Sequence, residues 1–181
     1  MEALLLMIEP GLKITSVSEC GLNVPAEDGN TEAERALRKA LYYFSLVHAP
    51  VLSEDDGIYF DGDLPVDVGI NIANSYQEAG GSPFDFWNNL LKTHNVISGI
   101  LKKSYALVTN KSSDTRLATI PFTVATLTGC ESIEENVMNH FIIPLGSTSA
   151  IAAMSVAERQ NFRMRYLAEP VSALLQSAGA L

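Results

Sequence analysis

Cysteine, charged residues and long apolar runs are all scarce in this sequence, and each scarcity excludes a class of protein. The 181 residues include only 2 cysteines and 18% charged side chains. Cys20 and Cys130 alone cannot build the disulfide framework of a small secreted domain, so we expect a reduced, cytoplasmic setting. A low charged fraction combined with 47% apolar residues excludes a mainly disordered chain.

Membrane-spanning and catalytic patterns are missing as well. No apolar run approaches the roughly 18 residues of a transmembrane helix. The apolar stretch Ala3–Ile8 follows Glu2 and ends at Glu9-Pro10, so we expect no signal peptide. The sequence contains no H-E-x-x-H or C-x-x-C metal pattern, no G-x-S-x-G nucleophile pattern and no phosphate-binding loop. These absences favour a non-enzymatic protein without deciding the question, and we expect no cofactor.

The patterns that are present indicate helices. A hydroxyl side chain at a helix N-cap accepts a hydrogen bond from a backbone amide of the first turn, and a glutamate three residues later reaches back to the cap. Behind each such start, apolar residues recur every three or four positions. The N-terminal signals are Thr31 with Glu34, Ser82 with Pro83, and Ser155 with Glu158. The predicted helices span about 31–48, 65–78, 82–108, 132–143 and 155–175, with Pro170 kinking or splitting the last one.

Extended structure is expected only in short pieces, over 12–17 and 58–60. The β-branched segment 117–128 fits either a buried helix broken at Pro121 or an extended segment, and we favour the helix because the rest of the chain indicates helices. No linker rich in glycine, serine or proline divides the chain. The sequence therefore predicts a single all-α domain over residues 1–181, a bundle of five or six helices with minor extended segments.

Charge is distributed unevenly between the two halves of the chain. Residues 1–90 carry 4 basic and 15 acidic groups, whereas residues 91–181 carry 8 basic and 6 acidic groups. The overall charge of -9 argues against a wholly basic coat around nucleic acid. The bipolar pattern predicts a homo-oligomer in which the acidic half of one copy meets the basic half of another, and no membrane partner.

One basic and aromatic face on the last predicted helix is a candidate nucleic-acid contact. Residues spaced by three and four share a face of a helix, and cations interleaved with aromatic rings suit phosphates and stacked bases. The candidate residues are Arg159, Phe162, Arg163, Arg165 and Tyr166, together with Lys102 and Lys103. An ordinary solvated surface is the alternative interpretation.

A metal site is the second candidate. His48 and His94 fall on the apolar stripes of two predicted helices, and histidines from packed helices bind metals in some bundles. The acidic segment 54–67 has the carboxylates that suit a hard cation, but an EF-hand frame begun at Asp61 lacks the required glycine and final glutamate. We therefore assign no metal site, and we expect a structural role for His94.

The function that this reading favours is structural. We expect a non-enzymatic interaction protein that self-assembles or binds a macromolecule, for example a coat or assembly subunit touching nucleic acid. The first alternative is a small helical metal-binding protein or enzyme that uses His48, His94 and the acidic 54–67 loop. The second alternative is an acidic regulator that binds a basic partner.

Overall fold

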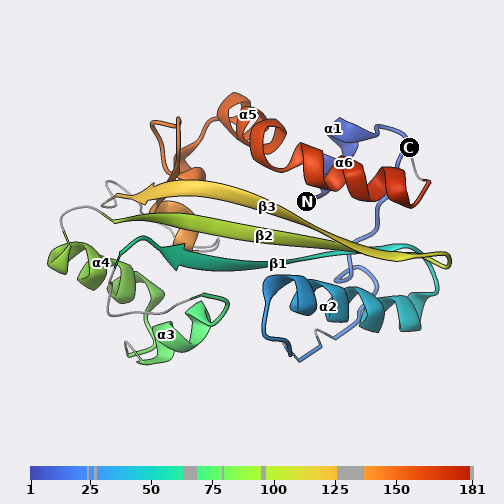
Figure 1. Cartoon of the computed structure of the whole chain (residues 1–181), viewed down its shortest axis with the longest axis horizontal. Coiled ribbons are helices and arrows are strands. Elements are labelled where there is room, and N and C mark those ends of the chain that lie inside the picture. The colour runs from blue at the N-terminus through green and yellow to red at the C-terminus, as the bar shows by residue number, and fades with distance from the viewer. Residues whose placement is uncertain are drawn as a thin grey trace. The chain divides into compact units, whose positions relative to one another are not determined.

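The computed structural model describes residues 1–23, 25–26, 28–62, 69–78, 80–94, 97–125 and 137–179. Four strands form one sheet in the order β1-β2-β3-β4, and β3 pairs antiparallel with β4 (Figure 1). The strands are β1 Val51–Phe60, β2 Ser98–Val108, β3 Ser113–Val124 and β4 Ile142–Pro144. The helices are α1 Glu2–Ile8, α2 Glu32–Val47, α3 Ile72–Glu78, α4 Pro83–Thr93, α5 Val156–Tyr166 and α6 Ala168–Ser177, with short 3-10 turns η1 Val137–His140 and η2 Ile151–Ala153. The prediction of an all-α bundle is wrong, because an antiparallel sheet is part of the fold.

The largest error concerns the long helix predicted from Ser82. Its start is confirmed, since Ser82 Oγ accepts a hydrogen bond from the amide of Asp85 at 3.2 Å. The helix ends at Thr93, and β2 begins at Ser98. The buried residues of this segment fit both a helix and a strand: Ile97, Leu101 and Tyr105. A spacing of four matches one helix turn, and because four is an even number it also keeps residues on one face of a strand.

Gly99 of β2 lies where the backbone of β1 approaches closely. A Cβ atom placed on Gly99 would lie 2.2 Å from the carbonyl oxygen of Tyr59 and 3.0 Å from the ring of Phe122. The backbones approach too closely at this point for any other residue. Gly99 is therefore a packing requirement of the sheet.

The segment that sequence patterns left open, 117–128, is extended as far as Val124. Ala118, Ile120 and Phe122 are buried and alternate with more exposed residues, which is the period of a strand. The preference for a helix over this stretch is wrong. Residues 126–128 lie outside the described residues, as does the predicted helix start at Ser132.

Other local predictions have mixed outcomes. The capping box at Ser155 is confirmed, and the last helix is split, with α6 beginning two residues before Pro170. Residues 58–60 are extended, as part of the longer β1. The prediction of an extended piece over residues 12–17 is wrong, because these residues belong to no strand of the sheet.

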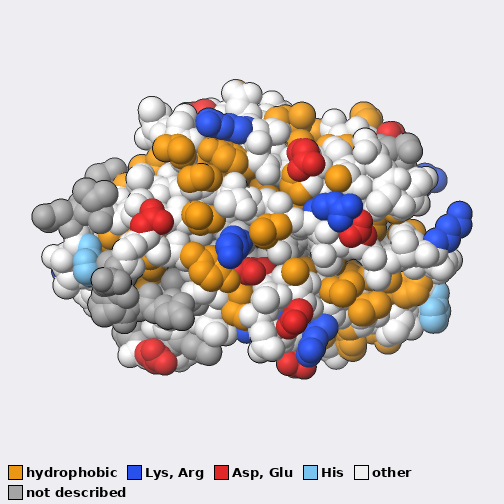
Figure 2. Space-filling view, viewed as in Figure 1, with side chains coloured by type: hydrophobic (Ala, Val, Ile, Leu, Met, Phe, Trp, Pro, Cys, Tyr) orange, Lys and Arg blue, Asp and Glu red, His pale blue; other side chains and the backbone are white. Residues whose placement is uncertain are grey.

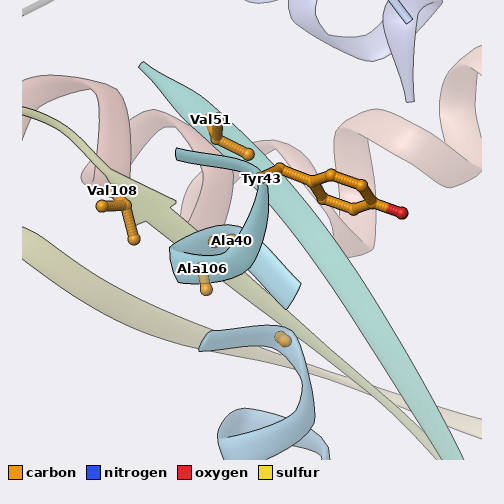
Figure 3. Packing of buried hydrophobic residues seen from close by; sticks show 6 residues of the cluster. Ala40, Tyr43, Val51, Ala106 and Val108 are labelled. Carbon is orange, nitrogen blue, oxygen red and sulfur yellow. The ribbon is translucent and has the colours of Figure 1, made fainter. Parts of the chain in front are cut away.

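The chain forms two compact units. Unit 1 comprises Met1–Asp55, Lys103–Ala118 and Gln160–Leu181, and unit 2 comprises Asp56–Lys102 and Thr119–Arg159. In unit 1, α2 packs on the strands through small side chains, with Ala40 next to Val51, Ala106 and Val108 (Figure 3). In unit 2, Trp87 stacks on Phe141 with ring centroids 5.5 Å apart. The prediction of a single domain concerns independent folding and stays a prediction.

Within the described ranges, no helix is long and apolar enough to cross a membrane.

Candidate catalytic pair on helix α2 and strand β1

Two carboxylates of unit 1 are buried, which is costly in free energy. Glu32 is 5% exposed and Asp55 is 8% exposed, and the only other polar residues buried to this degree in the described ranges are two serines. A buried charge costs several kcal/mol of desolvation unless another group compensates it. Buried ionisable groups with charged partners are therefore candidates for function.

Asp55 has a cationic partner on α2. Lys39 Nζ donates a hydrogen bond to Asp55 Oδ1, and the two side chains are 16% and 7% exposed. The aliphatic part of the Lys39 side chain lies on the side of α2 that packs on the sheet, beside Ala36 and Ala40. Its ammonium group thereby reaches the buried carboxylate. The result is an ion pair largely withdrawn from water.

Alternation along β1 directs Asp55 toward α2. Val51 belongs to the core beneath α2, and residues two and four positions further along a strand share its face. Ser53 confirms this register, because its hydroxyl donates to the carbonyl oxygen of Ala36. Glu54 points to the opposite side and is exposed.

Glu32 is the second buried carboxylate of unit 1. It lies in the first turn of α2, where the helix dipole favours negative charge.

A neighbouring ion pair shows what an ordinary surface contact looks like in this unit. Arg38 follows the same helix one residue before Lys39 and pairs with Asp28, but these side chains are 53% and 78% exposed. An exposed pair of this kind contributes roughly 0–1 kcal/mol. The Lys39–Asp55 pair differs in burial, and this difference singles it out.

The structure does not bring the predicted metal residues together. His48 is the exposed C-cap of α2, with a left-handed φ of 52°, and His94 is the C-cap of α4. The two histidines belong to different units. Within the described part of the chain, no three His, Cys, Asp or Glu side chains gather at a metal-binding distance. Of the acidic segment, residues 54–56 are part of β1, and residues 63–67 lie outside the described residues.

The predicted nucleic-acid residues are divided between helix and strand. Arg159 donates to the carbonyl oxygens of Met154 and Ala152 at 2.9 and 3.3 Å, so backbone groups hold its guanidinium. Phe162 and Tyr166 lie with ring centroids 5.6 Å apart on α5. The other α5 members are Arg163, which is half-buried, and Arg165, which lies 5.1 Å from the ring centroid of Tyr166.

The two lysines of β2 do not share a surface. Lys102 and Lys103 are consecutive strand residues, so their side chains point to opposite faces of the sheet. The ammonium group of Lys102 lies 4.1 Å from the ring centroid of Tyr59.

The Lys39–Asp55 pair was missed in the sequence, although it left a signal there. Lys39 interrupts the small apolar residues on the buried side of α2, between Ala36 and Ala40. A charged residue at a core-facing helix position needs a partner, and Asp55 belongs to the acidic segment that immediately follows. That segment was predicted to be a loop, whereas its first residues belong to strand β1.

Comparison with known proteins shows the fold. A scan against protein-family models finds no match, and a search of curated proteins finds no similar sequence. Among solved structures, the nucleoside-triphosphatase / dITP/XTP pyrophosphatase of Mycobacterium abscessus superposes with a TM-score of 0.65 at 18% identity, covering 96% of this chain and 92% of that chain.

Two further structures share the same fold. The Ham1 protein of Staphylococcus aureus has a TM-score of 0.63 at 16% identity, covering 96% of this chain and 92% of that chain. The HAM1 protein of Coxiella burnetii has a TM-score of 0.65 at 14% identity, covering 97% and 92%. The prediction of a structural coat or assembly subunit is contradicted, because the chain shares its fold with a protein described as a nucleoside-triphosphatase / dITP/XTP pyrophosphatase and with two Ham1 proteins.

Proposed function

We propose that this protein is a nucleoside triphosphate pyrophosphatase, which hydrolyses a nucleoside triphosphate to a nucleoside monophosphate and pyrophosphate. The observation that carries the proposal is the buried Lys39–Asp55 pair, in a fold shared with a dITP/XTP pyrophosphatase over almost the whole chain. The M. abscessus protein supplies the substrate class, a deoxyinosine or xanthosine triphosphate.

The pair offers the two groups that this hydrolysis needs. A water molecule attacks the α-phosphorus of the triphosphate and loses a proton. The bond between the α-phosphorus and the α,β-bridging oxygen breaks, and pyrophosphate departs with the electron pair of that bond. In this proposal, Asp55 accepts the proton as a general base. Lys39 offsets the charge that develops on the phosphate oxygens. Withdrawal from water strengthens both interactions.

A divalent cation fits this chemistry as part of the substrate. Mg²⁺ is usually held by one or two carboxylates together with phosphate oxygens, and it does not require an all-protein cage. Asp55 and Glu32 are the described buried carboxylates of unit 1 that suit this arrangement. Bound Mg²⁺ would neutralise charge on the triphosphate.

Substitution of Asp55 tests the proposal. We expect Asp55→Asn to lower the rate of pyrophosphate release from dITP or XTP at least 100-fold, because an amide cannot act as a base and general-base catalysis contributes about 10²–10⁴-fold. The matched control is Asp28→Asn, which removes the exposed carboxylate that pairs with Arg38 of α2 and leaves the rate within about twofold of wild type. An Asp55→Asn protein that is folded and fully active would refute the assignment.

The proposed activity also bears on location. Nucleoside triphosphates are intracellular metabolites, so we infer a cytoplasmic protein. The absence of a membrane-spanning helix from the described residues is compatible with this inference.

A further inference from the structure

Two polar links join helix α2 to strand β1, and they lie next to each other. Lys39 of α2 pairs with Asp55 of β1, and Ser53 of β1 donates its hydroxyl hydrogen to the carbonyl oxygen of Ala36. Ala36 and Lys39 are three residues apart, so they are neighbours on the surface of the helix. Ser53 and Asp55 are two residues apart, so they share one face of the strand. All four residues belong to unit 1.

The apolar contact beneath α2 is a weak constraint on where the helix lies along the strand. Much of that contact is made by Ala36, Ala40 and Ala106, each 0% exposed, and a methyl group is too short to interlock deeply with a facing surface. On the other side of α2, hydrophobic side chains are visible at the surface over its C-terminal part (Figure 2), where Leu41 and Leu46 are 46% and 48% exposed. The position of α2 therefore depends on the contacts of its inner side.

The two polar links differ in how strictly they fix that position. The lysine ammonium group is a compact charge on a flexible four-carbon chain, so it can follow a carboxylate through a small shift of the helix. A hydrogen bond from a short serine side chain is less tolerant, because it weakens steeply as its angle departs from linearity. The acceptor of Ser53 is a backbone carbonyl group, so the hydroxyl group holds the helix itself and not a mobile side chain.

The carbonyl group of Ala36 does not need Ser53 in order to be hydrogen-bonded. Inside α2, its oxygen accepts from the amide four residues later, which is that of Ala40. A carbonyl oxygen has two lone pairs, and the serine hydroxyl group uses the second. Loss of the hydroxyl group therefore leaves no unpaired polar group on the helix, and its effect on folding should be small. A role in positioning can thus be measured apart from a role in stability.

We propose that Ser53 is a positioning residue, which fixes α2 along β1 so that the Lys39 ammonium group and the Asp55 carboxylate keep their reactive geometry. This inference rests on the proposed pyrophosphatase function. In this role Ser53 touches neither the substrate nor the attacking water, and it acts only through the backbone of Ala36. Displacing reacting groups by about 1 Å can lower a rate about 10²-fold. The loss concerns the transition state, so kcat should fall while KM changes little.

Threonine and valine at position 53 form a matched pair of variants. Both are β-branched, both suit a strand and both have nearly the same shape, but only threonine keeps a hydroxyl group. For pyrophosphate release from dITP or XTP, we expect Ser53→Val to lower kcat about 10- to 100-fold with KM within about threefold of wild type. Ser53→Thr should keep kcat within about threefold of wild type, and the two variants should unfold at similar temperatures.

Ser45 supplies a control on the exposed side of the same helix. Its hydroxyl group donates to the carbonyl oxygen of Tyr42 at 2.7 Å, so it makes the same kind of bond to the backbone of α2 without reaching β1. Ser45→Ala should leave both kcat and KM unchanged.

Competitive labelling with acetic anhydride gives a second readout, which does not depend on turnover. The Lys39 side chain is 16% exposed and paired, so its amine should react slowly in the wild type. We expect Lys39 to be acetylated at least fivefold faster in Ser53→Val than in Ser53→Thr, because the shifted helix no longer holds the amine against Asp55. The exposed Lys111 serves as the internal reference and should react equally in both variants.

Equal kcat values for Ser53→Val and Ser53→Thr would overturn the proposal. So would a rise in KM without a fall in kcat, or equal acetylation of Lys39 in the two variants. A folded wild-type protein that releases no pyrophosphate would instead refute the proposed activity, and the labelling alone would then decide whether Ser53 holds the pair in place.

Discussion

At the scale of single residues, the energy of the Lys39–Asp55 pair is asymmetric. Bringing two charges out of water costs about as much as their attraction returns, so the intact pair adds little net stability. Removing one partner is different, because the other charge then stays buried without compensation. A catalytic role, as proposed, and a purely structural role therefore respond differently to substitution.

The double variant Lys39→Met, Asp55→Leu separates these roles. We expect Lys39→Met alone to lower the free energy of unfolding by about 3–5 kcal/mol, and the double variant to recover most of that loss because apolar side chains replace both charges. The double variant should nevertheless release no pyrophosphate. Urea unfolding measures the stability and a pyrophosphate assay the activity; an active double variant would mean that the pair is only structural.

Gly99 gives a prediction of the opposite kind, about stability alone. Gly99→Ala forces a Cβ atom against the Tyr59 carbonyl group, and overpacking of this kind costs about 1–3 kcal/mol or more. The control is Gly11→Ala, where the nearest atom to a new Cβ is a flexible Glu9 carboxylate oxygen at 3.1 Å. Thermal unfolding measures both variants, and equal melting temperatures would contradict the close approach of the two strands.

At the scale of elements, the sequence predicts helix starts well and strands poorly. Capping depends on three or four neighbouring residues, so Thr31, Ser82 and Ser155 could each be recognised locally. The strands depend on partners far along the chain. β2 was predicted to be helical because a spacing of four between buried residues fits both the period of a helix and that of a strand. The Lys39–Asp55 pair was missed for the same reason, since the two residues meet only when α2 packs on β1.

The stability of the N-terminal turn of α5 depends on pH. Glu158 Oε2 accepts a hydrogen bond from the amide of Ser155 at 2.8 Å, while Ser155 Oγ accepts one from the amide of Glu158 at 3.3 Å. These hydrogen bonds to Ser155 lower the pKa of Glu158 below its ordinary value. Because the folded state binds this proton more weakly, its stabilising effect is present above pH 4.5 and is lost as pH falls through the folded-state pKa.

Glu158→Gln removes the titration while it keeps a hydrogen-bond acceptor at the third helical position. We expect hydrogen exchange at the first turn of α5 to speed up below pH 4.5 in the wild type, beyond the intrinsic effect of pH, and to show no such additional change in Glu158→Gln. Identical pH profiles for the two proteins would show that the capping box does not form in solution.

At the scale of the whole molecule, the charge halves of the sequence do not coincide with the structural units. Unit 1 takes segments from the beginning, middle and end of the chain, so a division at residue 90 has no counterpart in space. The homo-oligomer inferred from that division stays a prediction. Composition gave no sign of this fold, because the shared architecture persists at 14–18% identity to the solved structures.

The most direct test of the central claim is to identify the products by phosphorus NMR. Purified protein is incubated with Mg²⁺ and dITP or XTP, and the phosphorus resonances are followed with time. The account predicts nucleoside monophosphate and pyrophosphate in equal amounts, and no products above background with Asp55→Asn. Orthophosphate and nucleoside diphosphate, or no turnover by the folded wild-type protein, would contradict it.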